Sequence, residues 1–171
     1  MNGNVRIGFG YDVHAFVVGR PLILGGVTIP YARGLDGHSD ADVVVHALCD
    51  AMLGALALGD IGQHFPSTDE RWHGVSSLRF LEHVTCLMCA EGYRLGNADI
   101  TIVAQQPRLA SHVASMAQRL ATTVGVSIGQ ISVKATTTDG LGFVGKTQGI
   151  AAYAVCLCVA QCPEDVRGDA S

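Results

Sequence analysis

The sequence carries a carboxylate and an imidazole two residues apart, in Asp12-Val13-His14. In a β-strand, residues two apart point to the same face, so these two potential metal ligands would project together. Gly8 and Gly10 lie on that face and are expected to leave space beside the pair. The opposite face, expected to lie against the core, carries Ile7, Phe9, Tyr11 and Val13. A strand end with incidental polar side chains would show the same spacing.

A second group of polar residues starts at His38 and continues along a predicted helix. Polar positions recur there at intervals of three or four residues, which places them in one stripe of an otherwise apolar helix. The stripe consists of Ser39, Asp42, His46 and Asp50. Unpaired backbone N–H groups at the helix start, together with the Ser39 hydroxyl and the His38 imidazole, suit phosphate oxygens. A solvated helix face with a surface histidine is the alternative interpretation.

The two groups together contain the ligands of a metal site. If His46 meets Asp12 and His14, one carboxylate and two imidazoles surround an ion and leave a position open, which is the pattern of catalytic zinc. Asp42 or Asp50, each four residues from His46, would then fix the tautomer of its ring. The sequence therefore predicts a divalent metal site between the first strand and the first long helix.

Two loops add polar groups of another kind. Residues 134–146, KATTTDGLGFVGK, combine threonine hydroxyls, the Asp139 carboxylate, which can hold a hard cation, and glycines that permit close backbone approach. Residues 104–110, AQQPRLA, connect a predicted strand to a helix, and their backbone groups could contact the edge of a base. Each loop alone is also compatible with an ordinary connection that binds nothing.

Hydrophobic periodicity and turn residues predict an α+β fold. The helix that carries His46 is predicted over 40–57, with Ser39 as its N-cap and Asp42 completing a capping box. The order of elements indicates a mixed β-sheet with helices packed on one face, which leaves the other face for subunit contacts. The other predicted elements are strands 5–14, 99–103, 131–137 and 149–159, a hairpin of 22–24 and 27–29 around Gly25-Gly26, a polar loop over 59–71, and helices 75–90 and 109–123.

The length and composition of the chain favour one domain in a homo-oligomer. Of its 171 residues, 49% are hydrophobic and 15% are charged. We expect a single domain over residues 1–160 and a disordered C-terminal tail over 161–171. The charged share is well below the usual value of about 25%, so part of the surface is expected to be covered by other subunits.

Charge and hydropathy narrow the classes of partner. The net charge of −4, with 11 basic residues spread singly, argues against nucleic-acid binding. The longest apolar run, 150–160, is shorter than the ~20 residues of a membrane-spanning helix, so no membrane contact is expected. A strand-like pattern begins within the first residues and leaves no room for a signal segment. We therefore expect a cytoplasmic protein.

Several cysteines and histidines have no ligand-like spacing. The six cysteines suit an intracellular chain and are expected to be small core residues, including Cys86 and Cys89 in a predicted helix and Cys156 and Cys158 in the last strand. The histidines expected to be surface or structural residues are His64, His73, His83 and His112.

The chain resembles the family of 2-C-methyl-D-erythritol 2,4-cyclodiphosphate synthases of the non-mevalonate isoprenoid pathway over residues 5–160. The resemblance rests on three segments in order: RIGFGYDVHAF at 6–16, HSDADVVVHALCDAMLGALALGDIG at 38–62 and VKATTTDGLGFVGK at 133–146. It implies a homotrimer with sheets facing the threefold axis and active sites at subunit interfaces. It also implies a phosphorus–oxygen lyase that converts 4-diphosphocytidyl-2-C-methyl-D-erythritol 2-phosphate into 2-C-methyl-D-erythritol 2,4-cyclodiphosphate and CMP.

The resemblance implies two metal ions. Asp12, His14 and His46 would bind Zn²⁺ or another divalent transition metal. Asp139 stands where the family usually has Glu, the protein ligand of Mg²⁺ or Mn²⁺, and is one methylene shorter. The 2-phosphate of the substrate would attack the β-phosphorus of the diphosphate, with CMP as the leaving group.

Further positions would contact the substrate, which is a small cytidine diphosphate compound. His38 and Thr137 match the family positions assigned to transition-state stabilisation. The family often has Arg where Lys146 stands and Glu where Tyr153 stands, so the resemblance does not carry isoprenoid-diphosphate binding in a central channel to this chain. The positions implied for substrate binding are Ser39, Asp60, Ile61, Gly62, Phe65, Pro66, Ser67, Thr68, Asp69, Ala104, Gln105, Gln106, Pro107, Arg108, Leu109, Ala110, Thr136, Thr138, Phe143 and Lys146.

Two other functions are compatible with the same residues. A zinc phosphodiesterase would use metal-bound water and release a linear product, whereas the cyclase releases CMP and a cyclic diphosphate. A trimeric nucleotide- or isoprenoid-binding module would bind CDP without turnover. The motifs GxSxG, HExxH and GxxxxGK[ST] do not occur, which argues against the corresponding hydrolase, zincin and P-loop classes.

Overall fold

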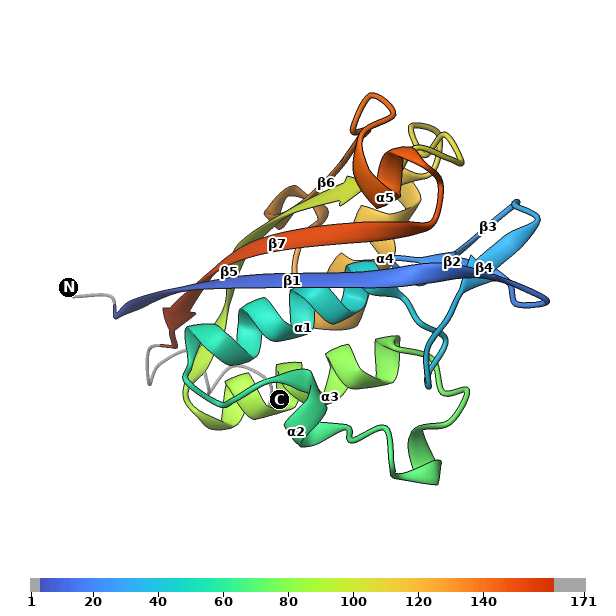
Figure 1. The fold of residues 1–171 in the computed structure, drawn as a ribbon. Helices are drawn as coiled ribbons and strands as arrows, with labels where there is room; N and C mark the ends of the chain where they lie inside the picture. The colour runs from blue at the N-terminus through green and yellow to red at the C-terminus, as the bar shows by residue number, and fades with distance from the viewer. Residues whose placement is uncertain (1–3, 162–171) are drawn as a thin grey trace.

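The computed structural model describes residues 4–161 and places a five-stranded sheet against a layer of helices (Figure 1). The strand order is β4-β1-β7-β5-β6, with β5 and β6 parallel and the other neighbours antiparallel. The strands of this sheet are β1 (Val5–Val18), β4 (Arg33–Leu35), β5 (Tyr93–Val103), β6 (Ile131–Thr136) and β7 (Gly149–Ala160). The predicted hairpin consists of β2 (Leu22–Leu24) and β3 (Val27–Ile29). The predicted α+β class with a mixed sheet is therefore confirmed, and β4 is an edge strand that the periodicity does not predict.

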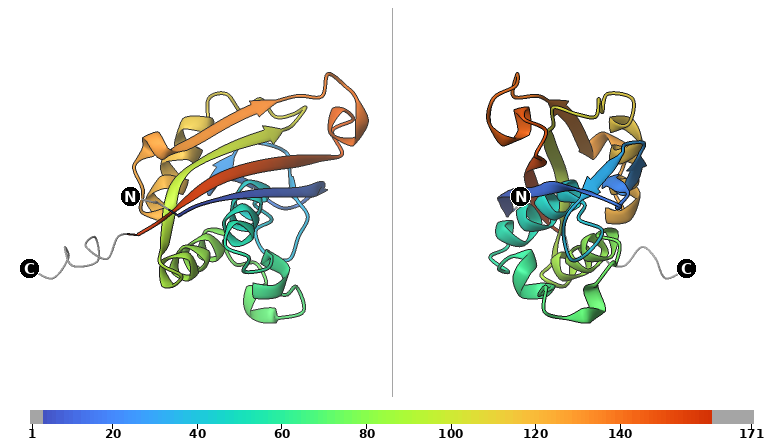
Figure 2. Two further views of the ribbon diagram at one scale, coloured as in Figure 1. Left: turned by 90° about the vertical axis from the view of Figure 1, so that its left-hand side faces the viewer. Right: turned by 45° about the vertical axis from the view of Figure 1, so that its right-hand side comes forward.

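Three longer helices form the second layer (Figure 2). The first packs across β1 and β7, the second against the first and β5, and the third against β6, so they share one face of the sheet, as predicted. They are α1 (Val43–Ala55), α3 (Leu78–Ala90) and α4 (Val113–Val124). Short helices occupy the connections: α2 (Ile61–His64), η1 (Glu70–Trp72), η2 (Ile128–Gln130) and α5 (Gly142–Gly145).

The prediction of which face of β1 lies against the core was wrong. The residues expected there have exposed fractions of 40–71%; they are Ile7, Phe9, Tyr11 and Val13. The side that carries the glycines is the buried one, because α1 lies directly on their backbone. A Cβ atom on Gly10 would stand 2.0 Å from the carbonyl oxygen of Ala47, and one on Gly8 would stand 1.8 Å from that of Ala51. The glycines bring the strand and the helix together and do not open space beside Asp12 and His14.

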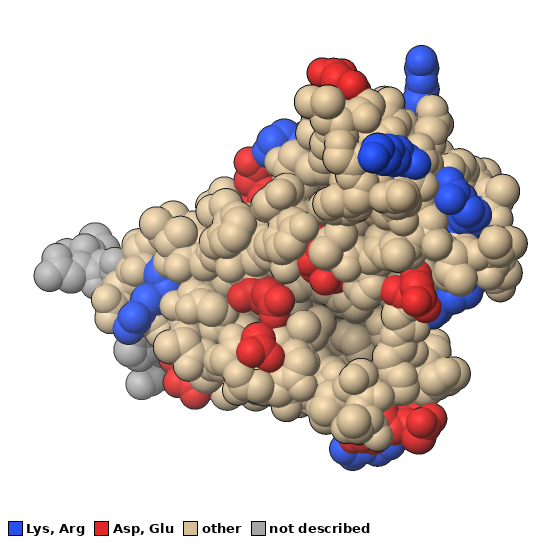
Figure 3. All heavy atoms as spheres, viewed as in Figure 1, with Lys and Arg blue, Asp and Glu red and all other residues tan. Residues whose placement is uncertain are grey.

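The exposed face of the sheet is apolar. Tyr153 and Val155 on β7 add to it with exposed fractions of 41% and 46%, and the Tyr153 ring lies 4.9 Å from that of Tyr11. Over β1 and β7 in Figure 3, most of the surface is neither acidic nor basic. In the single chain, this face therefore leaves several large hydrophobic side chains in contact with water.

Asp42, and not Ser39, is the N-cap of α1. Its carboxylate accepts hydrogen bonds from two backbone N–H groups in the first turn of α1, at 3.1 and 3.2 Å. It also accepts hydrogen bonds from Gly25 and Gly26, between β2 and β3, at 2.9 and 2.6 Å. Burial raises the pKa of Asp42 to about 6, although these backbone donors oppose the shift. The predicted capping box at Ser39 is wrong. The backbone N–H groups of the hairpin donate hydrogen bonds to the Asp42 carboxylate, and this carboxylate also caps α1.

Some elements differ from their predicted bounds. The helix predicted over 40–57 spans 43–55, β1 and β5 are longer than predicted, and α3 and α4 begin after 75 and 109. Val75 does not join α3, because its carbonyl oxygen accepts a hydrogen bond from the N–H of Asp40 at 3.0 Å. Within residues 4–161, no helix has the length and apolar character needed to cross a membrane. The predicted tail, apart from Gln161, lies outside the described residues.

The cysteines divide into two groups. Cys49, Cys156 and Cys158 are buried, as predicted. Cys86 and Cys89 are exposed, so the prediction of a core role for them was wrong. The reason is that α3 presents a different face to the core, formed by Phe80, Leu81, Val84 and Met88. Cys162 lies outside the described residues.

Candidate active site

Asp12 and His14 on β1 and His46 on α1 converge on one point. The Oδ2 atom of Asp12 lies 2.9 Å from Nε2 of His14 and 3.0 Å from Nδ1 of His46, and these two nitrogens are 3.2 Å apart. Ligands about 2.0–2.1 Å from a tetrahedral zinc ion stand about 3.3–3.4 Å from one another, which is close to these spacings. The side chains of Asp12, His14 and His46, which together form the ligand group, therefore fit three ligands of a divalent ion.

The two imidazoles are oriented by different partners. Nδ1 of His14 donates a hydrogen bond to the carbonyl oxygen of Asp36 at 2.5 Å, which leaves Nε2 for a ligand. Nε2 of His46 lies 2.8 Å from the hydroxyl oxygen of Ser77 and 3.2 Å from that of Ser39. One nitrogen of each ring therefore faces the Asp12 carboxylate and the other ring, and the second nitrogen makes a hydrogen bond, as in ordinary metal-binding histidines.

The prediction that Asp42 or Asp50 orients His46 was wrong. The Asp42 side chain turns back over the N-terminus of α1, where it accepts the hydrogen bonds described above. The Asp50 carboxylate accepts a hydrogen bond from the N–H of Ile61 at 2.8 Å. Helical spacing places these residues near one face of α1, but the neighbouring hairpin and loop supply their partners.

The pKa values of Asp12 and His14 show that the ligand group favours positive charge beside the Asp12 carboxylate. Burial disfavours the ionised form of Asp12, but hydrogen bonds with His14 and His46 outweigh it and hold the pKa of Asp12 below its usual range. Burial alone would lower the pKa of His14, yet the neighbouring Asp12 carboxylate raises that pKa overall. A carboxylate and two bases at this spacing suit a divalent cation, which would replace the protons.

A cavity of about 170 Å³ lies beside the ligand group. Part of its wall is aromatic, because the rings of Phe65 and Phe80 stack with centroids 4.3 Å apart and Trp72 meets both edge-on. Sequence reasoning missed Trp72 and Phe80, since aromatic residues at such positions are also typical of a core. The residues that line the cavity are His14, His38, Ser39, His46, Ile61, Gly62, Phe65, Ser67, Trp72 and Phe80.

His38 sits at the same cavity between two loop residues. Its Nε2 atom lies 3.2 Å from the carbonyl oxygen of Asp69, and the ring of His73 meets it edge-on at a centroid distance of 5.2 Å. The N–H of Gly74 donates to the carbonyl oxygen of His38 at 2.9 Å, which joins the two segments. His73 is exposed at the surface, as predicted, and also lies beside a residue predicted to be catalytic.

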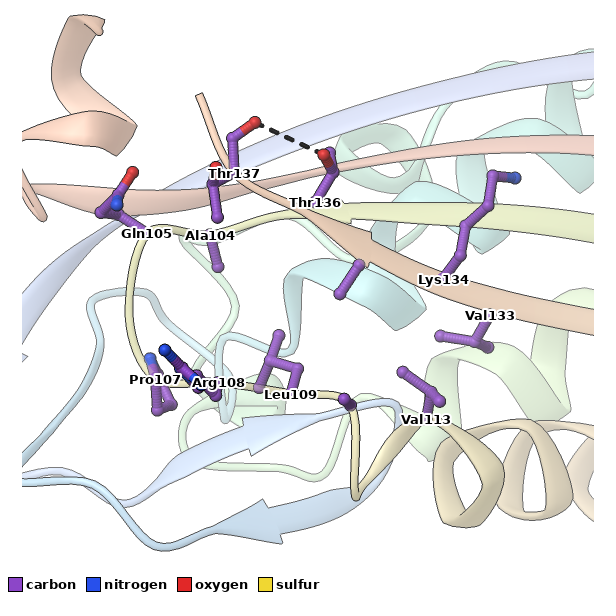
Figure 4. Close-up of a pocket in the computed structure, with 12 residues that line it drawn as sticks. Ala104, Gln105, Pro107, Arg108, Leu109, Val113, Val133, Lys134, Thr136 and Thr137 are labelled. Carbon is purple, nitrogen blue, oxygen red and sulfur yellow. Dashed lines mark hydrogen bonds between the residues drawn. The ribbon is translucent and has the colours of Figure 1, made fainter. Parts of the chain in front are cut away.

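A second cavity, of about 420 Å³, lies between the loop after β5, β6 and the start of α4. Figure 4 shows Thr136 and Thr137 on one side of it and Pro107 and Leu109 on the other. Most of its wall comes from the two loop segments predicted to contact substrate. The residues that line it are Ala104, Gln105, Pro107, Arg108, Leu109, Ala110, Val113, Val133, Lys134, Ala135, Thr136 and Thr137.

The loop after β6 is held by its own hydrogen bonds. Asp139 has a φ of +51°, a left-handed conformation that aspartate adopts more readily than most residues. The Thr137 hydroxyl donates to the Asp139 carboxylate at 3.2 Å, and the N–H of Gly140 donates to the side-chain carbonyl of Gln105 at 3.2 Å. The last bond joins this loop to residues 104–110, so the two predicted binding loops are adjacent.

Within one chain, the predicted site residues fall into separate sets. No residue of the described range lines both cavities. Asp60 instead caps α2, where its carboxylate accepts a hydrogen bond from the N–H of Gln63 at 3.0 Å. The predicted metal ligands that line neither cavity are Asp12 and Asp139, and the predicted substrate contacts that line neither are Asp60, Pro66, Thr68, Asp69, Gln106, Thr138, Phe143 and Lys146.

Nearly the whole described chain, residues 5–159, matches the model of the YgbB family. The chain belongs to the YgbB family. It is similar to the 2-C-methyl-D-erythritol 2,4-cyclodiphosphate synthase of Moorella thermoacetica, with 60% identity over 153 residues that make up 90% of this chain and 94% of the relative. Its identity to the protein of the same name from Syntrophobacter fumaroxidans is 56% over 153 residues, which cover 90% of this chain and 96% of that relative.

Solved structures share the fold of this YgbB-family chain. One is IspF of Plasmodium falciparum in a complex with CDP, with a TM-score of 0.83 and 33% identity, covering 95% of this chain and all (100%) of the other. Another is the bifunctional IspDF of Campylobacter jejuni, with a TM-score of 0.90 and 39% identity. That match covers 93% of this chain and 43% of the bifunctional protein.

Proposed function

We propose that this chain is a 2-C-methyl-D-erythritol 2,4-cyclodiphosphate synthase. It converts 4-diphosphocytidyl-2-C-methyl-D-erythritol 2-phosphate into 2-C-methyl-D-erythritol 2,4-cyclodiphosphate and CMP, a phosphorus–oxygen lyase reaction of the non-mevalonate isoprenoid pathway. The observation that carries the proposal is the group of Asp12, His14 and His46 beside a cavity. It occurs in a chain that is 53–60% identical to proteins of that name.

The donor sets fit two kinds of cation. Asp12, His14 and His46 would hold Zn²⁺, which accepts imidazole and carboxylate ligands in a tetrahedral set. Asp139 offers only oxygen and would hold Mg²⁺ or Mn²⁺. When bound, such cations polarise phosphoryl oxygens and neutralise the charge of a diphosphate.

The reaction is an intramolecular displacement at phosphorus. An oxygen of the 2-phosphate forms a bond to the β-phosphorus, the bond from that phosphorus to the bridging oxygen of CMP breaks, and CMP leaves with the electron pair. The protein supplies position and charge stabilisation, and no covalent protein nucleophile is required. His38 and Thr137 would donate hydrogen bonds to phosphoryl oxygens as their charge changes, and Ser39 would hold a phosphate at the smaller cavity.

The two cavities suit the two ends of the substrate. The cavity of about 420 Å³ between β6 and residues 104–110 would take the cytidine, with backbone groups along the base edge. The cavity of about 170 Å³ at the ligand group would take the methylerythritol part. Relatives of this fold are described in complex with CDP, which supports a site for the nucleotide part.

We propose that three copies assemble with their sheets facing a threefold axis. The apolar face of β1 and β7 supports this, because large side chains such as Ile7 and Phe9 would lose contact with water there. The two separate cavities support it as well, since neighbouring copies could bring one cavity of each kind together. Native mass spectrometry would show a trimer, and a monomer at working concentration would contradict the assembly.

Phosphorus NMR of the product tests the proposed reaction. Incubation of the metal-loaded protein with the diphosphocytidyl substrate is expected to give CMP and a cyclic diphosphate. A linear hydrolysis product would indicate a phosphodiesterase, and CDP binding without turnover would indicate a binding module. His46→Ala is expected to abolish turnover while the circular dichroism spectrum stays that of the wild type. Normal activity of His46→Ala with one zinc per subunit would contradict the assignment.

A further inference from the structure

Ser77, at the start of α3, lies against the ring of His46 and is completely buried. A serine at a helix start ordinarily caps its own helix, but the Ser77 side chain makes no such bond. Its hydroxyl oxygen is instead 2.8 Å from Nε2 of His46 and donates a hydrogen bond to Oδ1 of Asp40. The Ser77 side chain therefore forms its hydrogen bonds with residues outside its own helix.

The number of protons fixes the direction of these hydrogen bonds. A carboxylate can only accept, so the single hydroxyl proton of Ser77 points to Asp40. Ser77 then has only lone pairs to offer His46, and Nε2 of that ring must carry the proton. A neutral ring protonated at Nε2 has its lone pair on Nδ1, the atom that faces Asp12.

The second hydroxyl near His46 is farther away. Ser39 Oγ lies 3.2 Å from Nε2 of His46 and 3.2 Å from Oγ of Ser77, and it accepts a bond from the N–H of Ala41 at 3.2 Å. It has no carboxylate partner among these contacts. Ser77, at 2.8 Å and oriented by Asp40, is therefore the partner that determines the ring tautomer.

The backbone holds the two ends of this hydrogen-bonded chain in place. The N–H of Asp40 donates to the carbonyl oxygen of Val75 at 3.0 Å, and the N–H of Gly74 donates to that of His38 at 2.9 Å. These bonds join the segment before α1 to the segment before α3. Asp40 and Ser77 are therefore fixed relative to each other before any ligand binds.

We propose that Asp40 and Ser77 are positioning residues that hold His46 in the Nε2-protonated tautomer and present Nδ1 to the metal. The inference rests on the proposed metal site and adds residues outside the three ligands. With Nδ1 of His14 donating to the Asp36 carbonyl, both rings then offer lone pairs to the same point as the Asp12 carboxylate. Three lone pairs about 3 Å apart repel one another unless a cation lies between them. Loss of such a supporting bond typically weakens metal affinity by about 10–100-fold.

Zinc affinity of Ser77→Ala tests the proposal, with Ser76→Ala as the matched control. Ser76 precedes Ser77 at the same helix start, and its side chain is exposed. Competition with a chelator is expected to show zinc binding about 10–100-fold weaker in S77A and unchanged in S76A. In the zinc-loaded protein, long-range ¹H–¹⁵N imidazole spectra at pH 8 are expected to show the His46 proton on Nε2, and this proton should exchange with water faster in S77A than in the wild type.

Asp40→Asn supplies a second test that does not remove a buried hydroxyl. The asparagine oxygen still accepts the Ser77 proton, but the bond is no longer charge-assisted, so the loss of zinc affinity should be smaller than in S77A and larger than in S76A. If S77A fails to unfold cooperatively, D40N carries the test. Wild-type zinc affinity and an unchanged exchange rate of the His46 Nε2 proton in these variants would overturn the inference. A wild type that binds zinc no better than His46→Ala would instead overturn the proposed metal site.

Discussion

Alanine at position 10 would place a methyl group where α1 already lies. The Cβ atom would stand 2.0 Å from the carbonyl oxygen of Ala47 and 2.7 Å from the backbone nitrogen of Ala51. Real Cβ contacts essentially never fall under 3.0 Å, so strand and helix would have to separate by about 1 Å. Both opposing atoms belong to the main chain and cannot rotate away as a side chain would.

Gly10→Ala is therefore expected to lower the free energy of unfolding by about 3 kcal/mol, the upper end of the usual range for overpacking. It is also expected to weaken zinc binding, because His46 neighbours Ala47 on the displaced helix and metal sites tolerate ligand shifts of only about 0.2 Å. Urea unfolding of the metal-free protein would measure the first effect, and chelator competition the second.

Gly54→Ala is the matched control in the same helix. Gly54 is exposed, and no atom lies within 4 Å of a Cβ built there, so alanine should stabilise α1 by about 0.5–1 kcal/mol. A Gly10→Ala variant that keeps its unfolding free energy within about 0.5 kcal/mol and its zinc affinity would refute the reasoning.

Three further substitutions test other parts of the fold. Burial raises the pKa of Asp42 to about 6, so the stability that its protonated form contributes is lost as pH rises. Relative to Asp42→Asn, the wild type should lose about 2 kcal/mol of stability between pH 4 and 6, and urea unfolding without such a slope would contradict the reasoning. Ala57 is exposed with a φ of +57°, so Ala57→Gly should raise the unfolding free energy by about 0.5–1 kcal/mol; a lower melting temperature would contradict this. Asp139→Glu, which keeps the carboxylate, should retain turnover, and a severe loss would show that the cation lies closer to the backbone than proposed.

The pairing of Asp12 with His14 could be predicted because their spacing is local. Asp12 and His14 share a face in any strand, and the apolar helix that carries His46 needs a partner surface. Alternation does not say which face of a strand is inside. Ile7 and Phe9 suggested the core, but two glycines allow α1 to approach the other side more closely than any larger residue would.

The partners of the ligands could not be predicted, because they come from distant segments. Ser77 is 31 residues from His46, and its position at a helix start predicts only a cap. The pattern predicts Ser39 as the N-cap of α1, but Asp42 takes this position and also accepts hydrogen bonds from Gly25 and Gly26, which lie in a separate hairpin. Patterns in a single sequence relate residues that are near one another along the chain, and they do not identify hydrogen-bond partners that come from distant segments.

Two contacts outside the ligand motifs control different degrees of freedom of His46. The backbone contact between Gly10 and α1 sets the distance of His46 from Asp12 and His14. The hydroxyl of Ser77 sets which ring nitrogen faces them. Gly10→Ala should therefore change both stability and zinc affinity, because it moves a main-chain contact in the core. For each kcal/mol of unfolding free energy lost, Ser77→Ala should weaken zinc binding more than Gly10→Ala does. The reason is that Ser77→Ala alters the hydrogen bond to the His46 ring and leaves the packing of α1 on β1 in place.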